Sequence, residues 1–401
     1  MKDRRARGCL EGAVALAAAL ALAWPGAAHT GDRGTIKIAT QSPLSGELAD
    51  LGEGIKLSAQ LAMERLKGPV ESAGFRVELA PFDDQAEPHV GVANAKIMIG
   101  DGTILAVIGH LTSAVALPAS EVYREADLVM ISPAATDPLI TSRGLPNVNR
   151  VCGRDDAQGV AAAEFAARTL KVRSAYVVHS ADRHGAAIAQ AFREAADRLG
   201  LKVLGFDATD GPNTGPILTA IGAARPALVF FGGTYDQAVL AFRQARERTI
   251  RAEFLASSGP DSPEALPRTV GGAAGTHYTT VVGPVEAYPR AGEFAGAYRR
   301  RFGREPGRFA AQAYDATAVG LRALAAAIRA AGGRMPTRAA VAEAVRSVKH
   351  RGITGAIEFD ENGDLRSAGY FLYRVASDDP ASRGDDRAVG RLEIPGSPPR
   401  K

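Results

Sequence analysis

Cysteine is nearly absent from this chain, which holds only Cys9 and Cys152 among its 401 residues. Cys9 lies in an N-terminal segment of leader type, so removal of that segment leaves Cys152 alone and excludes an intrachain disulfide. Cys9 also precedes the apolar run of the leader, which is the wrong place for a lipid-anchored cysteine. We therefore expect stability to come from the core, and 46% hydrophobic residues are enough for two domains.

The motifs of common nucleotide-binding and hydrolytic enzymes are missing as well. There is no G-x-x-x-x-G-K-[ST] loop, no G-x-G-x-x-G opening a helix, no G-x-S-x-G elbow and no H-E-x-x-H. The seven histidines are dispersed, so we expect neither a metal ion nor a cofactor. Asp83, Asp84 and His184 are the only conceivable acid–base set of a secreted enzyme, but an Asp pair more often ends a strand or caps a helix. We expect a protein that is not an enzyme.

Charge of one sign is not in large excess. The formal net charge is +4 and the arginines are scattered along the chain, which argues against binding to nucleic acid or to a membrane surface. The one marked basic and apolar stretch is the N-terminus. Residues 1–28 combine a basic start, an apolar run and small residues that end at Ala28, which predicts a signal peptide cleaved near Ala28 and export to the periplasm. Either the general or the twin-arginine export route fits this segment.

From Thr35 onward, short β-like runs alternate with amphipathic helical segments, as in an α/β protein with parallel sheets. The alternation restarts after Asp155, so two similar units lie in series. A later stretch, 288–348, is mostly helical, and two β runs follow it around the Asn362-Gly363 turn. The tail from 377 to 401 is poor in apolar residues and is predicted to be disordered.

Small polar residues recur just past the ends of the predicted strands. Ser113 follows the apolar run "ILAVIGH", and Ala134 and Thr136 follow "LVMIS". The carboxyl ends of parallel strands meet at one edge of a sheet, where hydroxyls and helix N-terminal N–H groups can hold a carboxylate. Each residue alone would be explained as a helix cap. Their recurrence at one edge predicts a ligand site.

The segment "GHLTSAVALPASEVYREADLVMISPAATDPLITSRG" resembles the leucine/isoleucine/valine-binding proteins, which are substrate-binding receptors of branched-chain amino acid ABC transporters. "FDDQAEP", "FFGGTYDQAVLAFRQAR", "AQAYDAT" and "FDENGDL" extend the resemblance from about Thr35 to Val375. It implies a type I periplasmic-binding-protein fold, in which three crossing segments join two doubly wound lobes. We predict lobe 1 at 35–154 and 284–366, and lobe 2 at 155–283 and 367–376.

The resemblance also implies site residues. The family's carboxylate-binding serine falls on Ser113, and its backbone-binding alanine and its threonine fall on Ala134 and Thr136. In the second lobe, the position of a family tyrosine falls on His184 and that of the acidic residue that pairs with the ligand ammonium falls on Ser258. The remaining predicted ligand-binding positions are Leu51, Thr234, Tyr235 and Asp261. Asp236 and Asp261 are the candidates to replace the missing acidic residue.

The function implied is that of a monomeric receptor that closes its two lobes on a small carboxylate-bearing solute and delivers it to an ABC permease. A branched-chain or other apolar amino acid comes first among the ligands. An aromatic or aliphatic acid without an ammonium group comes second, because of Ser258, and an amide or urea-like solute comes third. A sensory module that signals to a receptor instead of a permease fits the same sequence.

Overall fold

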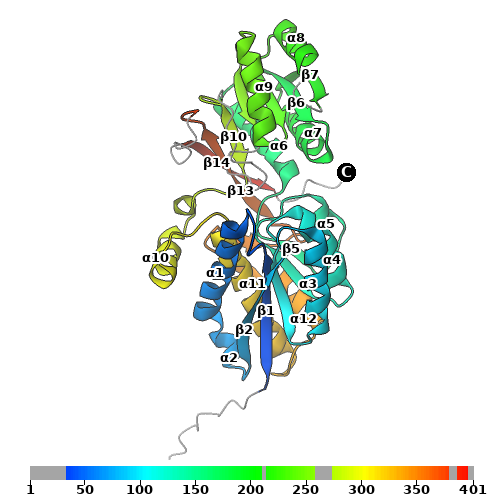
Figure 1. Cartoon of the computed structure of the whole chain (residues 1–401), viewed down its shortest axis with the longest axis vertical. Coiled ribbons are helices and arrows are strands. Elements are labelled where there is room, and N and C mark those ends of the chain that lie inside the picture. Colours follow the sequence, from blue (N-terminus) through cyan, green and yellow to red (C-terminus); the bar gives the residue numbers. More distant parts are fainter. Residues whose placement is uncertain (1–32, 210–213, 258–272, 379–385, 396–401) are drawn as a thin grey trace, which may run out of the picture.

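The computed structural model describes residues 33–209, 214–257, 273–378 and 386–395, which form two α/β lobes stacked along the long axis of the molecule (Figure 1). The predicted signal peptide, Ser258 and Asp261 lie outside the described residues. Among the described residues, no helix combines the length and the apolar character that a bilayer span requires.

The first lobe is built on a five-stranded parallel sheet in the order β2-β1-β3-β4-β5. Its strands are β1 (Thr35–Ser42), β2 (Arg76–Asp83), β3 (Ile104–Gly109), β4 (Val129–Ser132) and β5 (Val148–Arg150). Its helices and its small hairpin are α1 (Ala49–Leu66), α2 (Gly68–Glu71), α3 (Pro88–Gly100), α4 (Ser113–Arg124), α5 (Leu139–Ser142), α11 (Ala310–Ala330), α12 (Arg338–Arg346), β11 (Lys349–Arg351) and β12 (Ala356–Glu358).

The second lobe is built on a seven-stranded sheet in the order β14-β13-β10-β9-β8-β6-β7. Its strands are β6 (Ser174–Ser180), β7 (Lys202–Thr209), β8 (Leu228–Gly232), β9 (Glu253–Ala256), β10 (His277–Thr280), β13 (Ser367–Arg374) and β14 (Arg387–Pro395). The helical elements from Asp155 to Phe302 are α6 (Asp155–Glu164), the π-helical η1 (Phe165–Thr169), α7 (Arg183–Arg198), α8 (Gly215–Ala224), α9 (Tyr235–Glu247), η2 (Val285–Ala287) and α10 (Ala291–Phe302).

The parallel parts of the two sheets share one topology. Read as β7-β6-β8-β9-β10, the second sheet repeats the 2-1-3-4-5 order of the first, which is a doubly wound arrangement. Both faces of such a sheet are buried, so its strands are apolar without interruption, as β3 is. Ile108 belongs to the core on one face of the first sheet and Val107 to the core on the other. The predicted α/β fold of the type I periplasmic binding proteins is confirmed.

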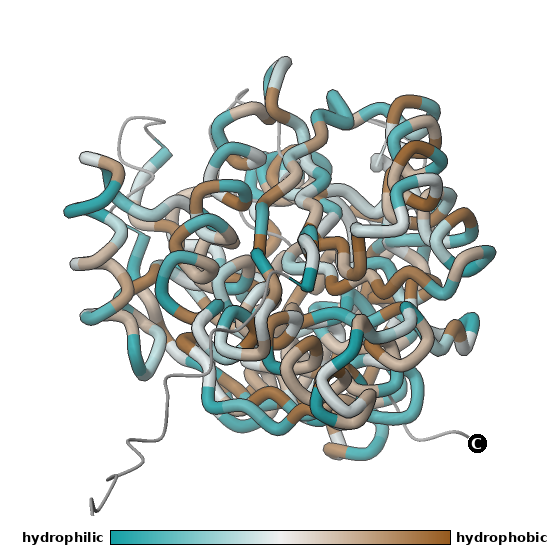
Figure 2. The backbone as a smooth tube through the Cα atoms, turned by 90° about the horizontal axis from the view of Figure 1, so that it is seen from below, coloured by the Kyte–Doolittle hydropathy of each residue, from teal (hydrophilic) through white to brown (hydrophobic). Residues whose placement is uncertain are grey.

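The outer helices are amphipathic. Along the outer coils in Figure 2, hydrophilic and hydrophobic stretches alternate. In α7 the buried residues Ile188, Ala189, Phe192, Ala195 and Ala196 recur at three- and four-residue spacing, which places them on one face of the helix. This apolar stripe packs against the second sheet and against α6, while Arg193, Asp197 and Arg198 are exposed.

The chain passes between the lobes three times. It crosses from β5 to α6, returns from β10 toward α11, and crosses again from β12 to β13. These passages agree in number with the three crossing segments that the resemblance implies. The lobe boundaries at residues 154, 283 and 366 remain predictions.

The prediction of a disordered tail is wrong for part of its range. Residues 387–395 form β14, which pairs antiparallel with β13 from Ser367 to Arg374. Main-chain hydrogen bonds hold this strand whatever its composition, and Ile394 is only 3% exposed in the core that also contains Tyr370. Asp, Arg and Gly are frequent over the tail as a whole. This average composition does not reveal the short segment that pairs with the edge of β13.

Candidate ligand-binding site

The predicted first-lobe residues lie together where β3 and β4 end. Ser113 is the first residue of α4, and its Oγ accepts hydrogen bonds from the main-chain N–H of Thr136 (3.2 Å) and of Asp137 (3.1 Å). Ala134 belongs to the same loop and is 3% exposed. The loop after β4 thus turns two consecutive N–H groups toward the hydroxyl that begins α4.

This arrangement leaves Ser113 as a hydrogen-bond donor. A serine oxygen has two lone pairs, and both face N–H groups here, so the O–H hydrogen is the remaining hydrogen-bonding group of the side chain. The N-terminus of the 12-residue helix α4 adds a partial positive charge at the same point. Together these groups can bind a carboxylate without any full positive charge.

A buried carboxylate that the sequence interpretation missed lies against the same loop. Asp155 is the first residue of α6, its side chain is 7% exposed, and its main-chain N–H donates to the Thr136 carbonyl (3.1 Å). Its Oδ2 lies 3.1 Å from His184 Nδ1, and its Oδ1 accepts from Gln158 Nε2 (3.1 Å). The Asp155 carboxylate therefore joins the first-lobe loop to His184 of the second lobe.

Asp155 is held as an anion. Burial by itself would raise the pKa of Asp155, but hydrogen bonds from His184 and from the Thr136 hydroxyl, together with the charge of Arg150, hold that pKa below its ordinary value. The site thus places a negative charge beside the donors for a carboxylate. No sequence pattern singles out Asp155, because the spacing of apolar residues predicts a helix only from about Gln158 to Leu170, one turn later than α6 begins.

His184 is placed by the start of α7. Asp182 caps this helix by accepting from the Gly185 N–H (2.8 Å), and this cap directs the first turn toward the other lobe. The preceding residue, Arg183, donates to Asp137 Oδ2 (2.6 Å). Of the predicted second-lobe ligand residues that the structure describes, only His184 contacts this cluster. Its side chain is 39% exposed.

The other predicted site residues have structural roles or lie outside the described residues. Thr234 is the N-cap of α9 and shares a capping box with Gln237, and Tyr235 is 6% exposed and packs edge-on against Tyr278. Leu51 is partly buried against the first-lobe core. Ser258 and Asp261 are not described.

The rival acid–base set is not assembled in the described residues. Asp83 accepts from the N–H groups of Leu44 (2.8 Å) and Gln85 (2.9 Å), which fits its interpretation as a turn residue at the end of β2. The Asp84 carboxylate is buried 3.2 Å from the His110 ring, whereas His184 contacts Asp155. Among the described residues, no group of three or more His, Cys, Asp or Glu side chains is placed to hold a metal ion.

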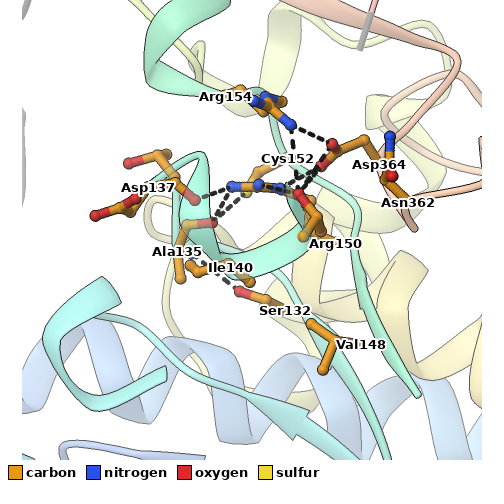
Figure 3. Close-up of polar contacts among 12 residues, drawn as sticks. Ser132, Ala135, Asp137, Ile140, Val148, Arg150, Cys152, Arg154, Asn362 and Asp364 are labelled. Carbon is orange, nitrogen blue, oxygen red and sulfur yellow. Dashed lines mark hydrogen bonds and ion pairs between the residues drawn. The ribbon is translucent and has the colours of Figure 1, made fainter. Parts of the chain in front are cut away.

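Behind the ligand loop lies a buried ionic cluster, which Figure 3 shows. Arg150, at the end of β5, is 0% exposed and donates to the main-chain carbonyls of Ala135 (3.1 Å) and Asp137 (3.0 Å). Its Nε also lies 2.6 Å from Asp364 Oδ1, while Arg154 Nη1 lies 2.6 Å from Asp364 Oδ2. One carboxylate of the third crossing segment therefore bridges two arginines of the first, and Asp156 supplies the second negative charge, 2.7 Å from Arg154.

Known proteins are similar to this chain along most of its length. A family model described as periplasmic binding protein matches residues 35–380. An amino acid binding protein of Pseudomonas aeruginosa is 33% identical over 343 residues, covering 84% of this chain and 89% of the relative. A leucine-, isoleucine-, valine-, threonine- and alanine-binding protein of the same species is 30% identical, covering 86% of this chain and 91% of the relative.

Solved structures share the fold. A leucine-binding protein from Thermotoga maritima superposes with a TM-score of 0.69 at 27% identity, covering 89% of this chain and 98% of the other. A solute-binding protein from Rhodopseudomonas palustris in complex with benzoate has a TM-score of 0.64 at 18% identity, covering 91% of this chain and 98% of the other. At that identity, the second likeness concerns the fold alone.

Proposed function

The chain belongs to the periplasmic binding protein family, and on that premise we propose that it is the receptor of an ABC importer for a small apolar α-amino acid. The relatives named for branched-chain amino acids support this ligand class, and the family supports a periplasmic location and permease subunits as partners. Lobe closure around the solute is the mechanism that two lobes and three crossings provide.

One observation carries the choice of an amino acid over a deaminated acid. The donor for a carboxylate, the Ser113 hydroxyl, lies in one hydrogen-bonded group with Thr136 and the ionised Asp155. The carboxylate and ammonium of an α-amino acid are separated by a single carbon, so a receptor needs donors and an anion side by side. Asp155 supplies the negative charge that is missing at position 258, where the sequence has serine. We propose Asp155 as the partner of the ligand ammonium, in place of Asp236 or Asp261.

The proposal is tested by thermal shift on the chain from residue 29, freed of bound solute by refolding. Leucine, isoleucine and valine are each compared with the deaminated acid and the amide of the same skeleton, because a ligand that binds only the folded state raises the Tm. We expect the amino acids alone to raise it. A shift by the deaminated acids alone would overturn the amino-acid assignment and favour the second ligand class.

Asp155→Asn extends the same test to the residue. The variant keeps the shape of the side chain but removes the charge, so leucine should lose its Tm shift, at a cost of roughly 2 kcal/mol or more for a buried ammonium without a counter-charge. Asp156→Asn is the matched control, because Asp156 is the next residue along the chain and its carboxylate pairs with Arg154 (2.7 Å). Equal leucine shifts in both variants would show that Asp155 does not hold the ammonium.

A further inference from the structure

The buried Arg150 guanidinium lies directly behind the loop whose N–H groups hold the Ser113 hydroxyl. It reaches the two carbonyls on either side of Thr136, those of Ala135 and Asp137, with one nitrogen, Nη1. The side chain is fully buried and extends from the end of β5, beside β4 in the sheet, so its own position is set by the strand. Figure 3 shows these bonds converging on the loop.

Peptide planarity converts these bonds into a direction for the Thr136 N–H. The Ala135 carbonyl and the Thr136 N–H belong to one trans peptide, in which C=O and N–H point in opposite directions. When Arg150 holds the carbonyl on one side, the N–H must point to the other side, where Ser113 Oγ accepts it at 3.2 Å. The next peptide is held likewise, since the Asp155 N–H bonds to the Thr136 carbonyl and the Asp137 N–H points at Ser113.

Asp364 in turn fixes Arg150. Its Oδ1 lies 2.6 Å from Arg150 Nε and also accepts from Thr141 Oγ1 (2.9 Å), while its Oδ2 pairs with Arg154. The Arg150 N–H bonds to the Gly363 carbonyl (2.9 Å), so backbone and side chain are both tied to the third crossing segment. A charge buried this deeply tolerates few alternative positions, because each would leave it without its counter-charge.

We propose that Arg150, held by Asp364, is a positioning residue for the ligand carboxylate. It acts through the Ala135–Thr136 peptide, which aims the Thr136 N–H and thereby orients the Ser113 hydroxyl. The role of Ser113 and Thr136 as ligand contacts rests on the proposed function, whereas the effect of Arg150 on the loop does not. Groups that support ligand contacts from behind commonly change affinity by about tenfold to a hundredfold when they are altered.

The test compares Arg150→Lys with Arg338→Lys. Lysine keeps the charge but cannot bridge two carbonyls and a carboxylate in the plane of a guanidinium. Arg338 is a matched control: it donates to the main-chain carbonyls of Met98, Ile99, Asp101 and Ile104, at the amino end of β3, the opposite end of the sheet from the site. Hydrogen–deuterium exchange of peptides that cover 133–142 and calorimetric titration with leucine are measured for both variants.

We expect Arg150→Lys to speed amide exchange in 133–142 and to weaken leucine binding by about tenfold or more, while Arg338→Lys leaves both unchanged. Equal behaviour of the two variants would overturn the proposal and reduce Arg150 to a stabilising core residue. If the wild-type chain does not bind leucine, the proposed ligand fails, and the exchange measurement alone still decides the role of Arg150. If Arg150→Lys does not fold, the variant Asp364→Asn takes its place, because asparagine keeps the shape of the side chain. Amide exchange and leucine binding are then compared with Arg338→Lys, and the same results support or overturn the proposal.

Discussion

At the scale of single residues, the site depends on where hydrogen atoms point. Ser113 accepts from two N–H groups and is left with one hydrogen to donate, and Asp155 is kept ionised by its neighbours despite burial. Both side chains are chemically ordinary. The role that we propose for them comes from partners that occupy most of the directions in which they can form hydrogen bonds.

Replacing Ser113 by alanine should weaken every carboxylate ligand by roughly 1 to 3 kcal/mol, because the ligand loses a donor and two N–H groups lose their acceptor. Titration calorimetry with leucine measures the change. Ser120→Ala serves as the control on the same helix, since the Ser120 hydroxyl bonds to the Leu117 carbonyl and to Arg143. An unchanged dissociation constant for Ser113→Ala would remove this residue from the site.

At the scale of elements, helix starts and strand edges decided what the sequence pattern left open. The helix predicted from about Gln158 begins at Asp155, so the Asp155 carboxylate lies against the loop after β4. β14 was predicted as disordered and is a strand, because β13 offers it an edge with matching hydrogen-bond groups. The conformation of a short segment depends more on the elements that it packs or pairs with than on its own composition.

The role of β14 can be checked through its buried residue. Ile394→Ala should lower the free energy of unfolding by about 2 to 4 kcal/mol. Ile394 is 3% exposed, and its truncation leaves a cavity in the core that also contains Tyr370. Chemical denaturation measures this. Glu393→Gln, on the exposed side of the strand, should change stability by no more than about 0.5 kcal/mol. Similar stabilities for the two variants would mean that β14 does not contribute to the core.

At the scale of the whole molecule, the proposed ligand groups come from both lobes. Ser113 begins α4 and Thr136 lies in the loop after β4, both in the first lobe. Asp155 and His184 lie in the first turns of α6 and α7 in the second lobe, and three passages of chain connect the two. The exposed Arg183–Asp137 pair bridges the lobes beside the site, but an ion pair in solvent contributes at most about 1 kcal/mol. We therefore expect the ligand, and not this ion pair, to drive the proposed lobe closure.

Small-angle X-ray scattering should show a smaller radius of gyration at saturating leucine, because a solute held by both lobes favours the arrangement in which they approach. The Asp155→Asn variant, at the same leucine concentration, should keep the radius of the ligand-free protein. A wild-type radius that does not change when leucine is bound would mean that the lobes already stand at their bound separation.

The sequence by itself determined the fold class and predicted the first-lobe half of the proposed site. Alternation of apolar runs and amphipathic segments is local, and Ser113, Ala134 and Thr136 follow strands whose ends must meet at one sheet edge. Only the tertiary structure decided which of many similar charged residues matter. Arg150 and Asp364 are 214 positions apart and meet because the crossing segments bring them together, whereas Asp155 meets His184 because α6 packs against α7. Such contacts do not change the local pattern of apolar and polar residues. Any Asp or Arg fits that pattern, and its role depends on the residues that contact it in the folded chain.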